Sequence, residues 1–180
     1  MRRSSISLLA IPLAGVTLLG GGALIYRNVM PRTAYVNLAQ AYRQFTLTRE
    51  LEAKLNATKR ARQAVLDSLA LQVRRLEARA QAEGGGRLDP ARSEALQTKA
   101  EEYRLKEKQF EEDNQALTEQ YTNQVWTQIN QYMKNYGKEH RYTYILGAEG
   151  SGVLMYADER FDITSDVIAY LNRRYGGAEH

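Results

Sequence analysis

Apolar residues recur at three- and four-residue steps along two long stretches of the chain, one on each side of Gly84-Gly85-Gly86. Such steps match the period of an α-helix that buries one narrow apolar stripe. The pattern therefore predicts two long helices within residues 49–136. The expected stripe of the first helix comprises Leu51, Leu55, Thr58, Arg62, Leu66, Leu69, Val73, Leu76 and Ala80, and that of the second comprises Leu96, Ala100, Tyr103, Glu107, Phe110, Asn114, Leu117, Tyr121, Val125, Ile129, Tyr132 and Tyr136.

A reversal of the chain is predicted between these two helices. Gly84, Gly85 and Gly86 supply a helix stop and a flexible turn, and Pro90 suits the first position of the next helix. We therefore expect an antiparallel helical hairpin with its turn at 84–90. A two-helix hairpin buries only one stripe per helix, so its stability should depend on a base or on other copies.

Folding the two stripes together gives a register that can be checked residue by residue. The best match places Leu76 opposite Leu96 and Leu69 opposite Tyr103. The polar breaks in the stripes also coincide in this register. We expect Arg62 near Phe110 and near Glu107 or Glu111, and Thr58 opposite Asn114.

The segments that flank the hairpin have the composition of a small β-rich head. Residues 33–38, 142–146 and 153–156 are rich in β-formers, and the glycine-rich stretch 147–152 is typical of a β-hairpin turn. A brief helix is expected at 39–45. Thr164 is expected to cap a final helix that Gly176-Gly177 ends.

Three short strands and one helix make a poor hydrophobic core by themselves. Association of several copies through strand edges would remove open edges and pool the small apolar faces. We therefore predict a trimer or another small ring, built on a head of residues 31–48 and 137–180. The expected head and oligomer core comprises Tyr35, Val36, Leu38, Ile145, Leu146, Val153, Leu154, Tyr156, Ile163, Val167, Ile168 and Leu171.

The N-terminal segment, residues 1–30, has the pattern of an export signal or a membrane anchor. No charged residue lies between Ser4 and Tyr26, whereas Arg2 and Arg3 precede this run and Arg27 follows it. The run is long enough to cross a bilayer. We favour an uncleaved membrane helix with a cytoplasmic N-terminus and the rest of the chain on the far side of the membrane. Cleavage near Gly21-Gly22-Ala23 would instead release a soluble exported protein.

Charge and composition argue against several other classes of function. Residues 49–83 carry eight Lys and Arg against five Asp and Glu, and residues 90–136 carry six against eight. The hairpin is thus nearly neutral, which removes the electrostatic footprint expected of a nucleic-acid-binding protein. The chain has no cysteine and only two histidines. We expect no catalytic site, no metal site and no cofactor.

The order of these elements resembles that of the Skp (OmpH) family of periplasmic chaperones. The most specific segments are 153–158, Val-Leu-Met-Tyr-Ala-Asp, and 161–168, Phe-Asp-Ile-Thr-Ser-Asp-Val-Ile. Residues 34–37 and 142–146 add to the similarity, which extends from residue 33 to about residue 172. The long charged hairpin is less specific, because many coiled coils look alike.

The resemblance implies an α+β fold in which helical hairpins project from the β-rich body of a homotrimer. It also implies an ATP-independent chaperone that holds unfolded outer-membrane or other exported proteins between the arms. Scattered apolar side chains with mixed charge suit weak binding of many different clients. Packing within the hairpin or against the head is an equally good interpretation of each candidate client contact, namely Leu47, Val65, Leu71, Leu105, Tyr121 and Trp126.

The expected tip of the hairpin departs from a strongly basic pattern, because Arg79, Arg87 and Arg92 are balanced by Glu83 and Asp89. We therefore carry over no lipopolysaccharide site. An alternative function is a membrane-anchored hairpin adaptor or a structural component of a cell-envelope transport complex. The flanks of the hairpin are short for such an adaptor, so we favour the chaperone.

Overall fold

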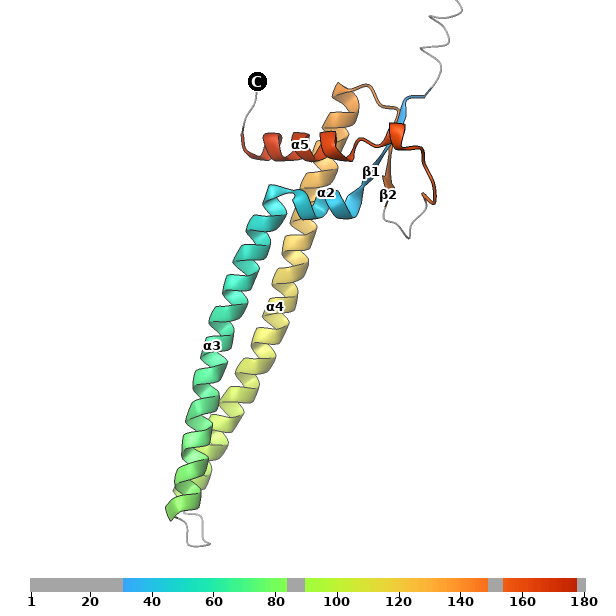
Figure 1. Ribbon diagram of the computed structural model, residues 1–180. Helices are drawn as coiled ribbons and strands as arrows, with labels where there is room; N and C mark the ends of the chain where they lie inside the picture. Colours follow the sequence, from blue (N-terminus) through green and yellow to red (C-terminus); the bar gives the residue numbers. More distant parts are fainter. Residues whose placement is uncertain (1–30, 84–89, 149–153, 178–180) are drawn as a thin grey trace, which may run out of the picture.

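The computed structural model of the chain describes residues 31–83, 90–148 and 154–177. The two long helices lie side by side as a rod, and the remaining elements gather at one end of it as a head (Figure 1). In chain order the elements are β1 (Thr33–Asn37), α2 (Leu38–Gln44), α3 (Thr46–Glu83), α4 (Pro90–Glu139), β2 (Tyr144–Ala148), the short 3₁₀ helix η1 (Glu159–Phe161) and α5 (Thr164–Tyr175).

The helical stripes predicted from the sequence form the contact between α3 and α4. Every predicted position in α3 is buried or half-buried, and so is every predicted position in α4 except the exposed Glu107. Full burial in α4 occurs only at Val125, Ile129 and Tyr136, close to the head. The rod therefore has little dry interior toward its tip, and it depends on the head for much of its stability.

The ends of the two helices lie where a reversal was expected. Helix α3 ends at Glu83 and α4 begins at Pro90. The turn residues Gly84, Gly85 and Gly86 lie outside the described residues. The predicted signal or anchor, residues 1–30, also lies outside them. Among the helices that the structure describes, none is long and apolar enough to span a bilayer.

The hydrophobic core of the head joins residues that are distant in the sequence. Val36 of β1, Ala41 of α2, Phe45 between α2 and α3, and Val167 and Leu171 of α5 are all fully buried. The head end of α4 completes this core through Val125 and Ile129. The α2 helix begins one residue before its expected position, at Leu38, because the side chain of Asn37 accepts a hydrogen bond from Gln40 N at 2.9 Å.

The sheet of the head differs from the predicted β-hairpin. Strand β2 pairs in parallel with β1, with Thr33 opposite Tyr144 and Asn37 opposite Ala148. Residues 154–156 do not form a strand, and Val153 lies outside the described residues. The expectation of a C-terminal β-hairpin was therefore wrong.

The glycine at position 147 explains why the hairpin prediction failed. The predicted turn begins at Gly147, but this residue continues β2 and lies opposite Val36. A Cβ at this position would come within 2.5 Å of Leu38 Cδ1. Glycine thus allows the close approach of β2 to the side chain of Leu38 at the start of α2, and the chain does not reverse here.

The start of α5 also differs from the prediction. The residue that precedes the helix is Ile163, and Thr164 is its first residue. The hydroxyl of Thr164 instead accepts a hydrogen bond from Asn37 N of β1 at 2.9 Å, while Asp162 Oδ1 accepts one from Thr164 N at 2.8 Å. This threonine therefore fastens α5 to the end of the sheet.

Helix α4 ends in a Schellman motif that has an arginine at the left-handed position. Tyr142 N donates to Gly137 O at 2.9 Å, and Arg141 N donates to Lys138 O at 3.2 Å. Arg141 has a φ of 58°, a conformation that usually favours glycine. The rings of Tyr136 and Tyr142 stack across the motif with centroids 6.1 Å apart.

Substituting Arg141→Gly should raise the free energy of unfolding by about 0.5–1 kcal/mol, because glycine adopts the left-handed conformation without steric cost. Urea unfolding followed by circular dichroism at one fixed protein concentration measures this change. Arg141→Val is the matched comparison and should destabilise the protein, since a β-branched residue tolerates positive φ poorly. Equal stability of the two variants would contradict the assignment of strain to this residue.

Candidate functional site

Surfaces, rather than an enclosed centre, are the candidate functional features of this chain. Within the described residues no cluster of three or more His, Asp or Glu side chains could hold a metal ion. Near the head, the side chains of Arg32, Glu139 and Arg174 are engaged in contacts between elements. The exposed side chains of the arm (α3 and α4 together) and of the head are therefore the candidate binding surfaces.

A polar layer in the middle of the arm holds α3 and α4 in a fixed register. Arg62 Nη1 donates to Asn114 Oδ1, and Arg62 Nη2 lies 3.4 Å from Asp113 Oδ2. The guanidinium carbon of Arg62 also lies 5.6 Å from the ring centroid of Phe110. The expected approach of Arg62 to Phe110 is confirmed.

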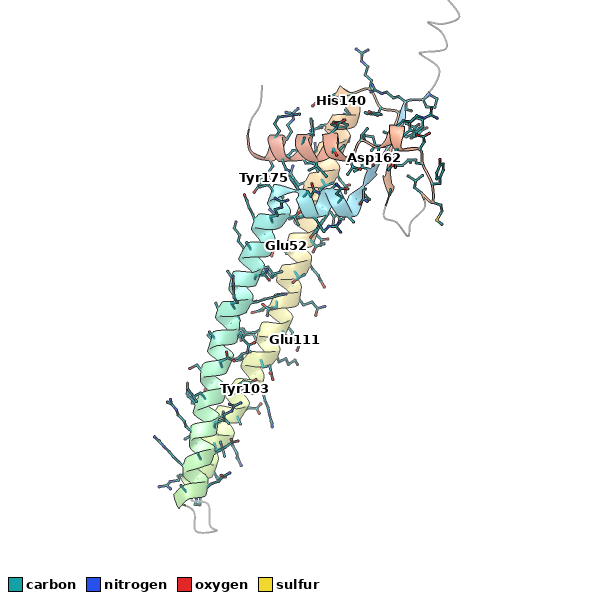
Figure 2. All side chains as sticks on the ribbon, in the orientation of Figure 1. Glu52, Tyr103, Glu111, His140, Asp162 and Tyr175 are labelled. Atoms are coloured by element: carbon teal, nitrogen blue, oxygen red, sulfur yellow. The ribbon has the colours of Figure 1, made fainter. Side chains whose placement is uncertain are left out.

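The acidic partner of Arg62 was predicted wrongly as Glu107 or Glu111. The carboxylate in contact is that of Asp113, which lies next to Asn114. Glu107 is exposed and accepts a hydrogen bond from Tyr103 OH at 2.9 Å. This bond is the main cause of the raised pKa of Tyr103. Figure 2 shows Tyr103 and Glu111 at separate levels along the arm.

Three of the predicted client contacts lie on the exposed surface of the arm. Val65 is 45% exposed, Leu71 is 48% exposed and Leu105 is 60% exposed. Leu71 and Leu105 each lie roughly half a turn from the stripe that packs the two helices together. These leucines do not pack in the seam between α3 and α4, so their side chains are available for contact with another molecule.

The other three predicted client contacts are part of the packed junction between arm and head. Leu47 is only 5% exposed. Tyr121 packs against the core, and the ring of Trp126 lies 5.3 Å from that of Tyr42 between centroids. These residues pack the arm against the head because α2 folds back over the base of α4. Their proposed contact with a client is therefore not supported by an exposed position.

Large apolar side chains are uncovered on one part of the head. Met155 is 88% exposed and Tyr156 is 84% exposed. Tyr144, Leu146 and Phe161 are also exposed, at 42–60%. A small apolar crevice of about 120 Å³ lies beside them, lined in part by Tyr35, Leu146, Leu154 and Phe161. We call Tyr144, Leu146, Met155, Tyr156 and Phe161 the open face of the head.

The described members of the predicted head and oligomer core fall into three groups in the single chain, exposed, half-buried and buried. Leu146 and Tyr156 are exposed and do not belong to the core of one chain. The half-buried members are Tyr35, Leu38, Ile145 and Leu154, and the buried members are Val36, Ile163, Val167, Ile168 and Leu171.

No pattern in the sequence indicates how α5 fixes the direction of the arm. Asn172 Oδ1 accepts from Thr46 N at 2.8 Å, and Asn172 Nδ2 donates to Gln44 O at 3.1 Å. Tyr175 OH donates to Glu50 Oε2 at the start of α3, and Figure 2 shows Tyr175 beside this junction. Because Asn172 bridges the end of α2 and the start of α3, it holds the bend from which the arm departs.

A second polar cluster fastens α5 to the end of α4. Tyr170 OH donates to Glu139 Oε1 at 2.9 Å, and Arg174 Nη2 lies 2.6 Å from the same oxygen. The hydrogen bond from Tyr170, followed by the charge and hydrogen bond of Arg174, lowers the pKa of Glu139 despite a partial opposing effect of desolvation.

The lowered pKa of Glu139 predicts a loss of stability in acid. A carboxyl group with a depressed pKa in the folded state stabilises the protein above its ordinary pKa of 4.5, and this contribution disappears as the pH falls through the folded-state value. Glu139→Gln should therefore lower Tm near neutral pH and reduce the difference between Tm at pH 7 and Tm at pH 3. Thermal unfolding at both pH values tests this.

Glu52→Gln is the control, since it removes an exposed carboxyl group from α3 near the head (Figure 2). If the Glu52→Gln and Glu139→Gln variants lost the same part of the acid dependence, the cluster around Glu139 would not be its source.

Comparisons with known proteins agree with this architecture. Residues 32–171 match the model of a family described as outer membrane protein (OmpH-like). None of the curated protein sequences matches the chain significantly. Among solved structures, a crystal structure of an OmpH-like protein from Caulobacter crescentus, described as a candidate outer membrane chaperone, is similar with a TM-score of 0.70. The two are 17% identical, and the similarity covers 81% of this chain and 86% of the other. At this level of identity the likeness concerns the fold.

Proposed function

Because the chain belongs to the OmpH-like family of outer membrane proteins, we propose that it is an ATP-independent periplasmic holdase chaperone. In this proposal a homotrimer holds unfolded outer-membrane or other exported proteins between its helical arms and slows their aggregation. The observation that carries the proposal is an arm whose tip half has a thin hydrophobic seam and freely exposed apolar side chains. An arm of this kind contributes a surface rather than a core.

Self-association through the head is supported by its incomplete burial. Parallel sheets are normally covered on both faces, yet β1 and β2 form a two-stranded parallel sheet next to the exposed Leu146, Met155 and Tyr156. Burying such side chains contributes about 1.5–3 kcal/mol each. Copies that share the open face of the head would remove these side chains from water and cover the edges of the sheet.

Client binding in this proposal depends on weak contacts that are distributed along the arms. Val65, Leu71 and Leu105 are exposed on the described part of the arm, amid charges of both signs. Isolated apolar side chains bind any one segment weakly, so many different unfolded chains can be held without a specific motif. Release then needs no nucleotide, because each contact breaks readily.

The periplasmic location is part of the same proposal. A client that is destined for the outer membrane passes through the periplasm, and the sequence of residues 1–30 has the pattern of an export signal or anchor. An uncleaved segment would hold the chaperone at the inner membrane, near the point where clients emerge. Alkaline extraction of membranes tests the tether, since a cleaved protein would appear in the soluble fraction.

The central experiment combines a mass measurement with an aggregation assay on residues 31–180, the segment that contains every packing contact described above. Light scattering is expected to give three times the monomer mass. The same preparation should suppress the aggregation of an unfolded outer-membrane β-barrel protein after dilution from urea, equally well with and without ATP. A monomer that leaves aggregation unchanged would overturn the proposed function.

A further inference from the structure

The two helices of the arm present opposite outer faces, each with one exposed leucine. The outer face of a helix is defined here as the side roughly 180° from the seam between α3 and α4. Leu71 lies on the outer face of α3 and is 48% exposed, and Leu105 lies on that of α4 and is 60% exposed. The two leucines therefore project from opposite edges of the arm.

These two leucines stand at the same level along the arm. Arg62 and Asn114 are hydrogen-bonded across the seam, and Val73 and Tyr103 line one cleft between the helices, so residues whose numbers sum to about 176 lie at similar levels on the antiparallel helices. Leu71 lies nine residues beyond Arg62, and Leu105 lies nine residues before Asn114. At 1.5 Å per residue, both lie roughly 14 Å from this tie, in the direction of the tip.

The two outer faces carry opposite charges. On α3 the outer face has Arg60 and Arg75 against Asp67, with Arg74 at its edge, where Arg74 also lines the cleft beside Tyr103 of α4. None of these three arginines forms an ion pair within the part of the chain that the structure describes. Over residues 90–120 the outer face of α4 has one basic residue, Lys108, and its acidic residues are Glu94, Glu101, Glu102, Glu112 and Glu119; Lys134 and Lys138 follow on the same face near the head.

The charged residues of the two outer faces also lie at matching levels along the arm, and the surfaces around the two leucines differ. Arg74 and Arg75 lie 12 and 13 residues beyond Arg62, and Glu102 and Glu101 lie 12 and 13 residues before Asn114. Leu105 lies in a shallow groove whose lining includes Thr98, Glu101, Glu102 and Gln109. On α3, Leu71 has the charged neighbours Asp67, Arg74 and Arg75 one turn away, and alanines, Ala64 and Ala78, one heptad away on either side.

We propose that the outer face of α3 in one copy packs against the outer face of α4 in the next copy when no client is bound. Leu71 then meets Leu105, and Arg74 and Arg75 lie beside Glu101 and Glu102. Contact between two α3 faces would oppose like charges, so the charges select a second copy that presents its α4 face. The contact is heterologous and, with arms that point the same way, it closes a ring.

This inference rests on the proposed self-association through the head, which makes the arms parallel and sets them side by side. In the client-free trimer, direct contacts between neighbouring arms would close the space between them. A client that needs Leu71 or Leu105 must compete with these contacts. Binding of a client would therefore separate neighbouring arms, and release of the client would allow them to pack together again.

Paired cysteines in the full-length chain test the contact, because the natural sequence has no cysteine. A disulfide needs Cα atoms within roughly 7 Å of each other. The pair Leu71→Cys and Leu105→Cys should form covalent oligomers on mild oxidation of the client-free protein. The matched control, Ala57→Cys with Leu105→Cys, also uses the two outer faces but is offset by roughly 21 Å along the arm. It should give at least about tenfold less covalent product.

Charge reversal identifies the partner face. Adding Arg74→Glu and Arg75→Glu to the Leu71→Cys and Leu105→Cys chain should reduce the covalent product by about tenfold, through repulsion from Glu101 and Glu102. Further addition of Glu101→Arg and Glu102→Arg should restore it. Restoration distinguishes a specific face from a general loss of solubility.

Three results would overturn the inference. Equal cross-linking of the 71/105 and 57/105 pairs, in a sample that light scattering shows to be trimeric, refutes the arm contact and leaves the proposed function intact. A monomer by light scattering refutes both. If the 71/105 pair remains unlinked and becomes protected from a thiol reagent only when an unfolded β-barrel protein is added, these faces serve the client and not a second copy.

Discussion

Replacing Met155 and Tyr156 together by aspartate should convert the proposed trimer into monomers and abolish its suppression of aggregation. Both side chains are more than four-fifths exposed in the single chain, at 88% and 84%. They contribute little to the core of one chain, so the helical content should remain. In the assembly, each aspartate would place a carboxylate in an apolar contact, which costs several kcal/mol for each copy.

Three features of the measurement separate assembly from folding. Circular dichroism should show unchanged helix content, light scattering should show the monomer mass, and the aggregation of an unfolded β-barrel client should proceed as if no chaperone were present. The control Ser165→Asp adds a carboxylate to the first turn of α5, where an acidic residue is tolerated, and removes no apolar surface. A trimer that persisted in the double-aspartate variant would show that the open face of the head is not the oligomer contact.

Substituting Phe45→Ala should reduce the free energy of unfolding by about 3–5 kcal/mol. Phe45 is fully buried at the bend between α2 and α3. Its ring contacts those of Tyr132 and Tyr175 edge-on, with centroids 6.3 Å and 5.6 Å away. Truncation would leave a cavity where α2, α3, α4 and α5 meet, and a loss of this size is a large fraction of the stability of a typical domain.

A substitution of Thr48, in the same core, is a control that should raise the free energy of unfolding where Phe45→Ala lowers it. Thr48 is 1% exposed, and its hydroxyl has no hydrogen-bond partner within the described part of the chain. Thr48→Val keeps the shape of the side chain and removes this unsatisfied group, so stability should rise by about 1–2 kcal/mol. Urea unfolding at a fixed protein concentration compares both variants with the natural chain. A loss below about 1 kcal/mol for Phe45→Ala would mean that the head does not depend on this packing.

The helical arm could be read from the sequence because its pattern is repeated many times. The positions from Leu51 to Ala80 and from Leu96 to Tyr136 carry the same period, so the stripe tolerates individual breaks such as Arg62 and Asn114. The sequence alone could not show which acidic residue contacts Arg62, because Glu107, Glu111 and Asp113 lie within two turns of one helix. Only the exact offset of α3 against α4 selects Asp113.

The candidate site was only partly visible in the sequence. Val65, Leu71 and Leu105 were identified as apolar residues at or beyond the seam edge, and they are exposed. Leu47 and Trp126 met the same criterion and yet are packed at the junction with the head. Helical periodicity tells which side of a helix a residue occupies. It does not tell whether another element covers that side.

The sequence by itself determined the two long helices, the place where the first ends and the second begins, and the residues that join them. Each of these depends on a local signal or on a period summed over many residues. Only the tertiary structure decided the parallel pairing of β1 with β2, the use of Gly147 for close approach to Leu38, and the role of Asn172 at the bend. These contacts join segments more than 100 residues apart, and each occurs once. Their energy depends on where the whole arm returns the chain to the head, so no local pattern could specify them.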